Sequence, residues 1–208
     1  MARVSVVSGR EPRRQVRSAA TQRAFLDAAR EVFAELGFAE ASVAEIVRRA
    51  GASVGSLYHQ FGGKNELFLA LYDELDADLS QRAVRAVAEA RTEHGDDPPL
   101  LFAAGGRAYL EGCWHRREIV RIFAHGDGPP GFDALRRSRA QEWIRQNAIL
   151  LRAADRSVNR ALAVILTTVL GESGREVVAC RTRADAVELI DAVVGLLIHL
   201  PSSPKGVS

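Results

Sequence analysis

The stretch from Ser42 to Phe61, SVAEIVRRAGASVGSLYHQF, decides the fold that we expect for the N-terminal part of the chain. It is typical of two short helices joined by a glycine turn. Ser42 precedes Glu45 with the S-x-x-E spacing of a capping box, which predicts a helix start. Gly51 ends this helix, because glycine adopts the left-handed conformation without a Cβ penalty. Two short helices across such a turn indicate a helix-turn-helix, whose second helix fits the major groove of DNA.

Ser53 opens the second of these helices, because its hydroxyl can accept a hydrogen bond from a backbone N–H of the first turn. The spacing places Val54 and Leu57 on the inward face and leaves Ser53, Ser56 and His59 able to face outward. The first helix also turns one apolar face inward, formed by Val43, Ile46, Val47 and Ala50. The pair is too short to bury a core alone, so longer helices are expected around it.

A longer helix is predicted on each side of the pair. Residues 18–36 carry apolar side chains at three- and four-residue intervals, and Gly37 ends this helix. Its apolar stripe consists of Phe25, Ala28, Ala29, Val32, Phe33 and Leu36. The following helix opens at Lys64 and runs to about Ala90. Its apolar face consists of Leu67, Phe68, Leu71, Leu75 and Leu79.

Several ordered pieces of this region match one known pattern. They are Gly37-Phe38, Ser42, Ala50-Gly51, the run SLYHQF of residues 56–61, and Lys64-x-x-Leu67. Together they resemble the N-terminal domain of TetR-family (tetracycline-repressor-like) transcriptional regulators, over about residues 21–72. The rest of the chain is similar only in length and helical character. Gly63 departs from the pattern, because family members commonly have a Ser, Asp or Asn cap there.

The resemblance implies a DNA-binding transcriptional regulator, a repressor that binds a palindromic operator in double-stranded DNA as a homodimer and is released by a small-molecule effector. It implies an all-α fold, with an N-terminal three-helix helix-turn-helix domain and a C-terminal helical ligand-binding and dimerisation domain. The expected parts are a flexible basic arm (1–17), the DNA-binding domain (18–64), the effector-binding and dimerisation domain (65–200) and a tail (201–208). An activator, a regulator without a ligand, and a helical small-molecule-binding module that has lost DNA binding are the alternatives.

The polar residues around the second helix are the candidate DNA contacts. The resemblance implies that Tyr58, His59 and Lys64 hold the DNA backbone, together with Ser42 at a helix N-terminus. It places a further set in the groove, which is Ser53, Val54, Gly55 and Ser56. Serine can bond several base edges and valine can touch a thymine methyl, so direct readout is expected to be modest. Taken singly, Tyr58 could instead be a core aromatic and His59 a plain surface residue.

The charge distribution agrees with this division of the chain. Residues 1–64 hold ten Arg or Lys against six Asp or Glu, whereas residues 65–208 hold eighteen against twenty. A basic N-terminal third is typical of a DNA-reading module. The first seventeen residues include five arginines, which can contact phosphates or a minor groove, although a solvated tail is the alternative.

The second half predicts further helices at residues 100–116, 117–125, 132–152, 156–180 and 184–200, with a possible kink at Gly171 or Gly174. By resemblance, the middle helices hold a mostly apolar effector pocket. Its candidate residues are Phe102, Tyr109, Trp114, Phe123 and Trp143, for which simple core packing is the alternative. Trp114 and Trp143 are the preferred wall, since a tryptophan N–H needs a partner.

The last two helices are the expected dimer face, because they carry more apolar surface than a solvated helix pair tolerates. The residues are Leu162, Ile165, Leu166, Val169, Leu170, Val187, Leu189, Ile190, Val194, Leu197 and Ile198. The alternative is that these helices fill the core of the single chain, and we expect them to do part of both.

Other classes of protein are disfavoured by the sequence. Two cysteines outside any C-x-x-C arrangement imply neither a disulfide framework nor a zinc site, which fits a reducing cytoplasm. An uninterrupted apolar stretch typical of a signal peptide or a membrane span is lacking. No cofactor is expected.

Two short motifs suggest other chemistry. Residues 51–55 fit the G-x-S-x-G elbow of hydrolases, but that motif requires a preceding strand, and a helical stripe precedes it here. We therefore expect no enzyme. Glu111, His115 and Glu118 lie at helical intervals, with Cys113 between them, and could line up on one face as metal ligands. The arginines around them favour an ordinary salt-bridged surface, so no metal site is expected.

Overall fold

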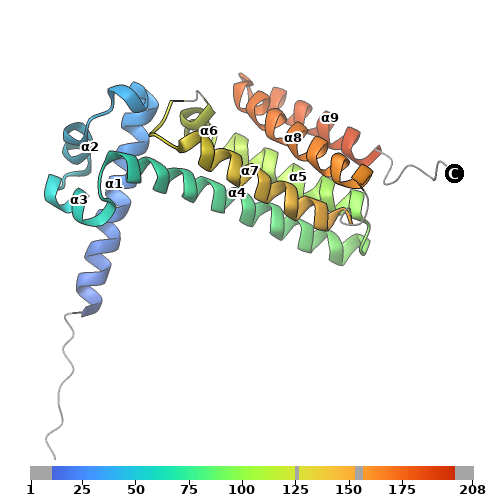
Figure 1. Ribbon diagram of the computed structural model, residues 1–208, viewed down its shortest axis with the longest axis horizontal. Helices are drawn as coiled ribbons and strands as arrows, with labels where there is room; N and C mark the ends of the chain where they lie inside the picture. The colour runs from blue at the N-terminus through green and yellow to red at the C-terminus, as the bar shows by residue number, and fades with distance from the viewer. Residues whose placement is uncertain (1–10, 125–126, 153–156, 200–208) are drawn as a thin grey trace, which may run out of the picture. The chain divides into compact units, whose positions relative to one another are not determined.

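The computed structural model describes residues 11–124, 127–152 and 157–199, and these residues form helices and their connections without any strand (Figure 1). The helices are α1 (Glu11–Glu40), α2 (Val43–Ala50), α3 (Val54–Phe61), α4 (Lys64–His94), α5 (Pro98–His115), α6 (Arg117–Ala124), α7 (Phe132–Leu150), α8 (Ser157–Ala179) and α9 (Arg183–His199). The all-α prediction, with a helix-turn-helix near the N-terminus and a helical remainder, is confirmed.

The chain divides into two compact units. The first ends at Leu71 and also includes Asp127–Pro129 from the connection between α6 and α7, whereas the second contains the other residues from Tyr72 onward. Helix α4 therefore contributes its first two turns to one unit and its remainder to the other.

Helix α1 begins at Glu11, seven residues before the predicted start at Ser18. Pro12 is its second residue, a position where the missing N–H of proline leaves no helical hydrogen bond unmade. The predicted arm of residues 1–17 therefore overlaps the helix, while residues 1–10 and the predicted tail of residues 201–208 lie outside the described residues. Gly37 interrupts α1 with φ 76° and ψ 173°, so the predicted break at this glycine is confirmed.

The two short helices of the first unit begin and end as the sequence predicts. Ser42 Oγ accepts a hydrogen bond from Glu45 N at 3.2 Å, and Ser53 Oγ accepts one from Ser56 N at the same distance. Gly51 adopts the left-handed conformation after α2, with φ 61°. These caps satisfy N–H and C=O groups that a helix end otherwise leaves without partners, so the turn between α2 and α3 is locally determined.

Aromatic rings from α1 and α4 form the centre of the first unit. Phe33 lies 5.2 Å from Phe68 and 6.0 Å from Phe38, measured between ring centroids, and Phe38 lies 5.0 Å from Phe68. The apolar faces of α2 and α3 close this core through Ile46, Val47 and Leu57, all buried. The short helices thus obtain from α1 and α4 the burial that they cannot provide alone.

The core of the second unit lies where α5 packs against α8 and α9. Its buried residues are Phe102, Ala103, Leu110, Leu166, Leu170, Val177, Ala186, Ile190, Val194 and Leu197. Helix α8 runs through Gly171 and Gly174 as one element, so the predicted kink is wrong. A Cβ on Gly174 would lie 3.2 Å from Cys113 Sγ and from the Tyr109 ring, so this glycine serves close helix packing instead.

Candidate nucleic-acid interface and ligand cavity

Helix α3 is held by the buried Leu57, and several of its other side chains are exposed to solvent. Leu57 is fully buried, whereas Val54 is 48% exposed and Tyr58 is 54% exposed. The inward assignment of Val54 from its spacing was therefore wrong, because this residue lies at the exposed start of the helix. His59 is also exposed, and Ser56 is half-buried. The α3 surface, which we define as Ser53, Val54, Ser56, Tyr58 and His59, combines hydroxyl, imidazole and apolar groups on one short helix.

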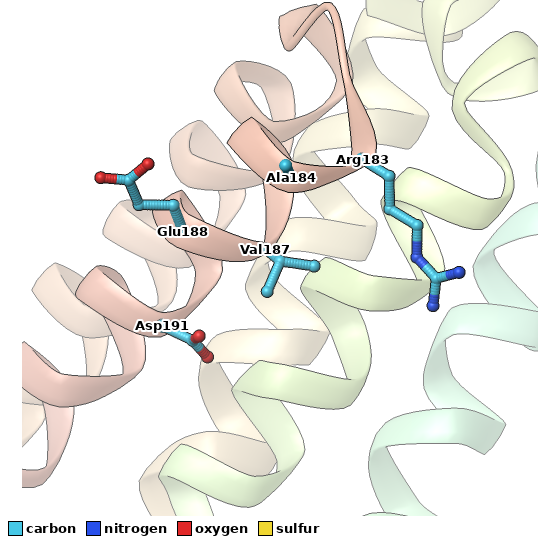
Figure 2. A pocket seen from close by; sticks show the side chains of 5 residues that line it. All are labelled: Arg183, Ala184, Val187, Glu188 and Asp191. Atoms are coloured by element: carbon cyan, nitrogen blue, oxygen red, sulfur yellow. The ribbon is translucent and has the colours of Figure 1, made fainter.

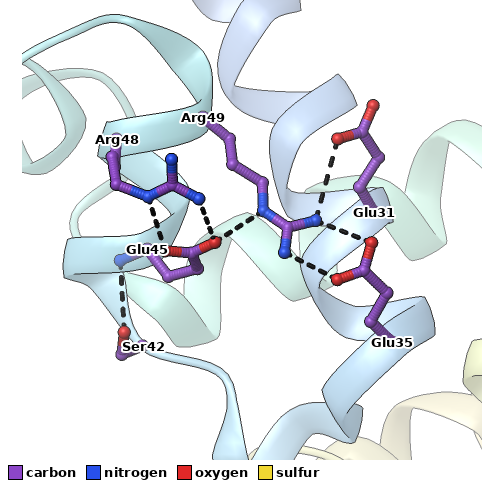
Figure 3. Close-up of polar contacts among 6 residues, drawn as sticks. All are labelled: Glu31, Glu35, Ser42, Glu45, Arg48 and Arg49. Carbon is purple, nitrogen blue, oxygen red and sulfur yellow. Dashed lines mark hydrogen bonds and ion pairs between the residues drawn. The ribbon is translucent and has the colours of Figure 1, made fainter.

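Arg49 fastens α2 to α1 through two carboxylates of α1, Glu31 and Glu35, and also pairs with Glu45 of α2 itself (Figure 3). Its Nη1 and Nη2 donate to the two oxygens of Glu35 at 2.8 and 2.6 Å, and its Nε donates to Glu45 Oε1 at 2.7 Å. Glu31 Oε2 lies 3.9 Å from the same guanidinium. Bidentate pairing fixes the direction of the guanidinium as well as its distance. The orientation of α2 on α1, and hence the start of the turn to α3, is therefore set by side chains as well as by the core.

Arginine neighbours also determine the titration of these carboxylates. Hydrogen bonds from Arg48 and then from Arg49 lower the pKa of Glu45 from 4.5 to about 2. The hydrogen bonds from Arg49 also lower the pKa of Glu35 below its ordinary value. The cluster consequently keeps its ion pairs well into the acid range.

The ammonium group of Lys64 is bonded to the segment that follows Gly37. Its Nζ donates to Phe38 O at 2.8 Å and Ala41 O at 2.9 Å, lies 3.4 Å from Ala39 O, and sits 4.4 Å from the centroid of the Phe38 ring. This structural role was not foreseen from the sequence. Contact between Lys64 and a DNA phosphate stays a prediction.

A separate cavity of about 650 Å³ lies within the second unit. It is lined by residues of α4 to α8, and it brings together four of the five predicted pocket residues, which are Phe102, Tyr109, Phe123 and Trp143. Trp114 is not part of this lining. Its ring lies 4.7 Å from the Arg117 guanidinium and packs against the core of the unit. The aromatic residues of the middle helices thus predicted the cavity correctly, but the assignment of Trp114 to its wall was wrong.

Polar groups mark one region of the cavity wall. Trp143 Nε1 donates to Asp76 Oδ1 at 3.1 Å, which gives this tryptophan N–H its partner. The Tyr109 ring lies 5.7 Å from the Trp143 ring, and burial raises the pKa of the Tyr109 phenol well above its ordinary value. Burial likewise raises the pKa of the Cys113 thiol to about 12, so this cysteine is a packing residue and not a reactive thiolate.

Comparison with known proteins adds to this geometry. Residues 25–71 match the family described as bacterial regulatory proteins, tetR family. This region of the chain carries the N-terminal domain of the TetR family. The matched residues include all of α2 and α3 and the flanking parts of α1 and α4 that bury them.

Relatives of known name show where the family likeness lies. The chain is 38% identical over 86 residues to the HTH-type transcriptional regulator BetI 2 of Chromohalobacter salexigens, a match that covers 41% of this chain and 38% of BetI 2. It is 39% identical over 61 residues to the A-factor receptor protein of Streptomyces griseus, covering 29% of this chain and 22% of the receptor. The chain therefore matches well under half the length of these two relatives.

Solved structures resemble the whole fold. A TetR-like transcriptional regulator from Rhodococcus sp. RHA1 superimposes with a TM-score of 0.63 at 24% identity, over 85% of this chain and 93% of that one. A transcriptional regulator from Aquifex aeolicus VF5 gives a TM-score of 0.66 at 22% identity, over 85% and 97%. At such identities the likeness establishes the fold and carries no ligand or partner across.

The residues of the predicted dimer face differ in how far they are buried in the single chain. Leu166, Leu170, Ile190, Val194 and Leu197 are buried in the core of the single chain, whereas the outward side of α8 and α9 has exposed apolar residues. These are Val164, Ile165, Val169, Val187, Leu196 and Ile198. An open depression on α9 is bordered by Arg183, Ala184, Val187, Glu188 and Asp191 (Figure 2). Which surface another subunit would cover stays a prediction.

Neither the G-x-S-x-G motif nor the candidate metal ligands have the structural surroundings that a hydrolase or a metal site requires. The serine of G-x-S-x-G, Ser53, follows a helix and caps another, so the strand that a nucleophile elbow requires is replaced by α2. Among the residues that the structure describes, no group of three or more His, Cys, Asp or Glu side chains is placed to hold a metal. Each helix in the described ranges is too short or too polar to cross a lipid bilayer.

Proposed function

We propose that this protein is a DNA-binding transcriptional regulator in which α3 lies in the major groove. The observation that carries the proposal is the α3 surface. A helix anchored by one buried leucine and exposing Val54, Tyr58 and His59 leaves its outer side free for a duplex. Because the matched relatives are covered only in part, this activity is inferred for the chain and is open to direct test.

Each residue of the interface has a proposed role that suits its chemistry. The Tyr58 hydroxyl and the His59 imidazole bind phosphate oxygens, and Ser42 lies at the N-terminus of α2, where N–H groups and the helix dipole favour an anion. Ser53 and Ser56 face base edges, and Val54 contacts a thymine methyl. Lys64 adds a phosphate contact if its ammonium can reach one while it remains bonded to the α1 segment.

A single helix-turn-helix reads too few bases to bind tightly, so we infer a homodimer on a palindromic operator. The two recognition helices would then lie about 34–36 Å apart, one turn of DNA. Support for an interface through α8 and α9 comes from their exposed Ile165, Val169, Leu196 and Ile198, a set of apolar side chains that a solvated surface disfavours.

The cavity of the second unit supports a regulator that responds to a small molecule. We propose that the ligand binds between α4, α5, α7 and α8, shifts α4 and lowers operator affinity, so that the protein acts as a repressor. Ligand and operator must then weaken each other by the same factor, because one coupling free energy is measured from two sides.

An electrophoretic mobility shift on the DNA that flanks the gene of this protein tests the proposal. The wild-type chain should shift such a fragment at low salt, and Tyr58→Phe should weaken binding about tenfold or more, since a hydrogen bond to a charged group contributes about 1.5–3 kcal/mol. Tyr109→Phe, in the cavity, should bind DNA as the wild type does. Absence of any shift at low salt would instead favour a small-molecule-binding module without DNA activity.

A further inference from the structure

The cavity in the second unit is elongated along α4. Its lining on this helix extends from Tyr72 to Arg91, and one side of the helix contributes to it at nearly every turn. At a rise of 1.5 Å per residue, these nineteen steps correspond to a length of about 28 Å. An extended chain that follows this side of α4 would contact lining residues along that whole length, whereas a compact ring system would contact only part of it.

Away from Asp76 and Trp143, most of the cavity wall is apolar. Leu79, Ala83 and Val87 line it from α4, and they face apolar residues from the other helices. Those include Phe102, Ile144, Leu150 and Leu170. A ligand that fills this part gains stability in proportion to the apolar surface that it removes from water.

The charged groups of the lining are largely paired with one another or with nearby residues. Asp76 accepts from Trp143 Nε1 at 3.1 Å, and its other oxygen lies 3.8 Å from Arg139 Nε. Arg139 Nη2 also donates to Asp73 at 2.8 Å. The remaining pairs are Arg175 with Glu172 and Arg91 with Asp96, whereas Asp133 and Arg137 are exposed residues of opposite charge at the start of α7.

Arg136 differs from these groups. It is half-buried and lines the cavity, and its Nη1 donates to the backbone carbonyl of Phe123 at 3.3 Å. Its guanidinium lies 5.9 Å from the Phe132 ring centroid. No carboxylate of the described ranges lies within ion-pair distance of it. The guanidinium is therefore held in place by one hydrogen bond and keeps other N–H donors available at the cavity wall.

Tyr72 stands next to this cation and contributes a hydroxyl. Its ring packs at 5.2 Å from Phe123 and 5.1 Å from Phe132, the two residues that also position Arg136. A partly buried cation without a counter-charge is unfavourable, and an anionic group of a ligand would relieve that cost. One unneutralised guanidinium matches one negative charge, and its planar fork fits the two oxygens of a carboxylate.

We propose that the ligand of this cavity is an amphipathic carboxylic acid with an unbranched apolar chain. Its carboxylate pairs with Arg136 beside Tyr72, and its chain extends along α4 past Leu79 and Val87. This inference rests on the proposed ligand-binding role of the cavity and specifies the chemical class of the ligand.

Calorimetric titration of the full chain with decanoate and with 1-decanol, both below their micelle and solubility limits, tests the inference. The two probes share a chain length and differ in the charged head. Decanoate should bind about tenfold or more tightly than 1-decanol, as expected for a charge-assisted hydrogen-bonded pair. Arg136→Gln should abolish that preference and change 1-decanol binding less than about twofold. Arg136→Lys should retain part of the preference, because it keeps the charge but loses the fork.

Arg145→Gln is the matched control, since it makes the same substitution on the same helix at an exposed residue outside the lining. It should leave both affinities unchanged, and thermal unfolding should verify that Arg136→Gln is folded. Equal binding of the two probes, binding of neither, or a preference that persists in Arg136→Gln would each overturn the inference. None of these results depends on DNA, whereas failure of the mobility shift would overturn the proposed regulator and leave the ligand class unaffected.

Discussion

The ammonium group of Lys64 has protein partners before any DNA is present. Loss of its bonds to Phe38 O and Ala41 O in Lys64→Ala should lower the free energy of unfolding by about 1–3 kcal/mol, because buried carbonyls lose a charged donor. Urea denaturation measures this value. Lys64→Gln, which keeps an N–H donor, should be less destabilised, and equal stability of Lys64→Ala and the wild type would contradict the structural role.

The phosphate role of Lys64 has a separate readout. Removal of one cation that binds a phosphate should reduce the slope of log affinity against log salt by about one unit for the duplex. Measured at several salt concentrations, Lys64→Ala should therefore show a shallower slope than the wild type. A lower affinity with an unchanged slope would assign this lysine to the protein alone.

For single residues, local chemistry predicted the helix caps. It did not predict contacts between residues that are far apart in the sequence. Ser42, Gly51 and Ser53 were foreseen because a capping hydroxyl or a left-handed glycine acts on neighbours within four residues. The partners of Lys64 lie 23 to 26 residues earlier and meet it only because Gly37 redirects the chain. Val54 was misassigned because a helical period does not show which end of a helix projects from its neighbours.

At the scale of elements, the stability that Glu45 gives to α2 through Arg48 and Arg49 should depend on pH. The pKa of Glu45 falls from 4.5 to about 2 on folding, so this carboxylate stabilises the fold above pH 4.5 and loses that effect as the pH falls toward 2. Arg49→Gln removes a main partner of the cluster and should flatten the stability profile in this window. Urea unfolding at pH 6 and pH 3 measures the difference.

The control for Arg49 is Arg23→Gln, which removes an exposed partner of Asp27 within α1. An exposed pair of this kind contributes little, so the profile of this variant should stay close to that of the wild type. Because Arg48 still pairs with Glu45 in this variant, an acid-induced loss of stability in Arg49→Gln as large as in the wild type would show that Arg49 itself adds nothing to the pH dependence.

The contact between α4 and α5 requires the absence of a side chain. A Cβ on Gly105 would lie 2.9 Å from Val87 Cγ2, and the β-branched valine has little rotamer freedom to move away. Gly105→Ala should therefore lower the free energy of unfolding by about 1–3 kcal/mol in urea denaturation. Gly171→Ala in α8, where a Cβ meets no atom within 4 Å, should be neutral or stabilising by about 0.5–1 kcal/mol.

Helices were the most predictable elements, because their apolar periodicity and their terminal residues act over short distances. The start of α1 at Glu11 was missed, since the arginine-rich residues 11–17 lack an apolar stripe and only their helix propensity favours the structure. Helix α8 was predicted as one helix, but the role of its glycines was missed. A glycine within a helix can mark either a kink or close packing, and only the neighbouring Tyr109 and Cys113 decide between them.

For the whole molecule, the exposed apolar residues of α8 and α9 predict a dimer with two-fold symmetry. Ile165→Glu combined with Leu196→Glu should yield a monomer by light scattering coupled to size exclusion, because both residues are more than half exposed in the single chain. Its operator affinity should fall as well, since one helix-turn-helix binds alone. Ile149→Glu, an exposed residue on α7, should keep the wild-type mass, and an unchanged mass in the double variant would place the interface elsewhere.

At this scale, the all-α architecture and the helix-turn-helix followed from periodicity and motif spacing. The cavity could only be suggested, because a list of aromatic residues does not reveal which rings converge and which pack outside, as Trp114 does. Nothing in the sequence distinguishes Arg136 from the other twenty-five arginines. Its lack of a carboxylate partner among the described residues depends on how α7 packs in the fold.

The glycines of α5 carry a consequence for any attempt to shorten the chain. Gly105, Gly106 and Gly112 each lower intrinsic helix formation by about 1 kcal/mol relative to alanine, so the isolated segment would not stay helical. The helical conformation of α5 therefore depends on its packing against α8 and α9. A fragment that lacks these last two helices should therefore lose α5 as well, and limited proteolysis should cleave it within residues 98–115.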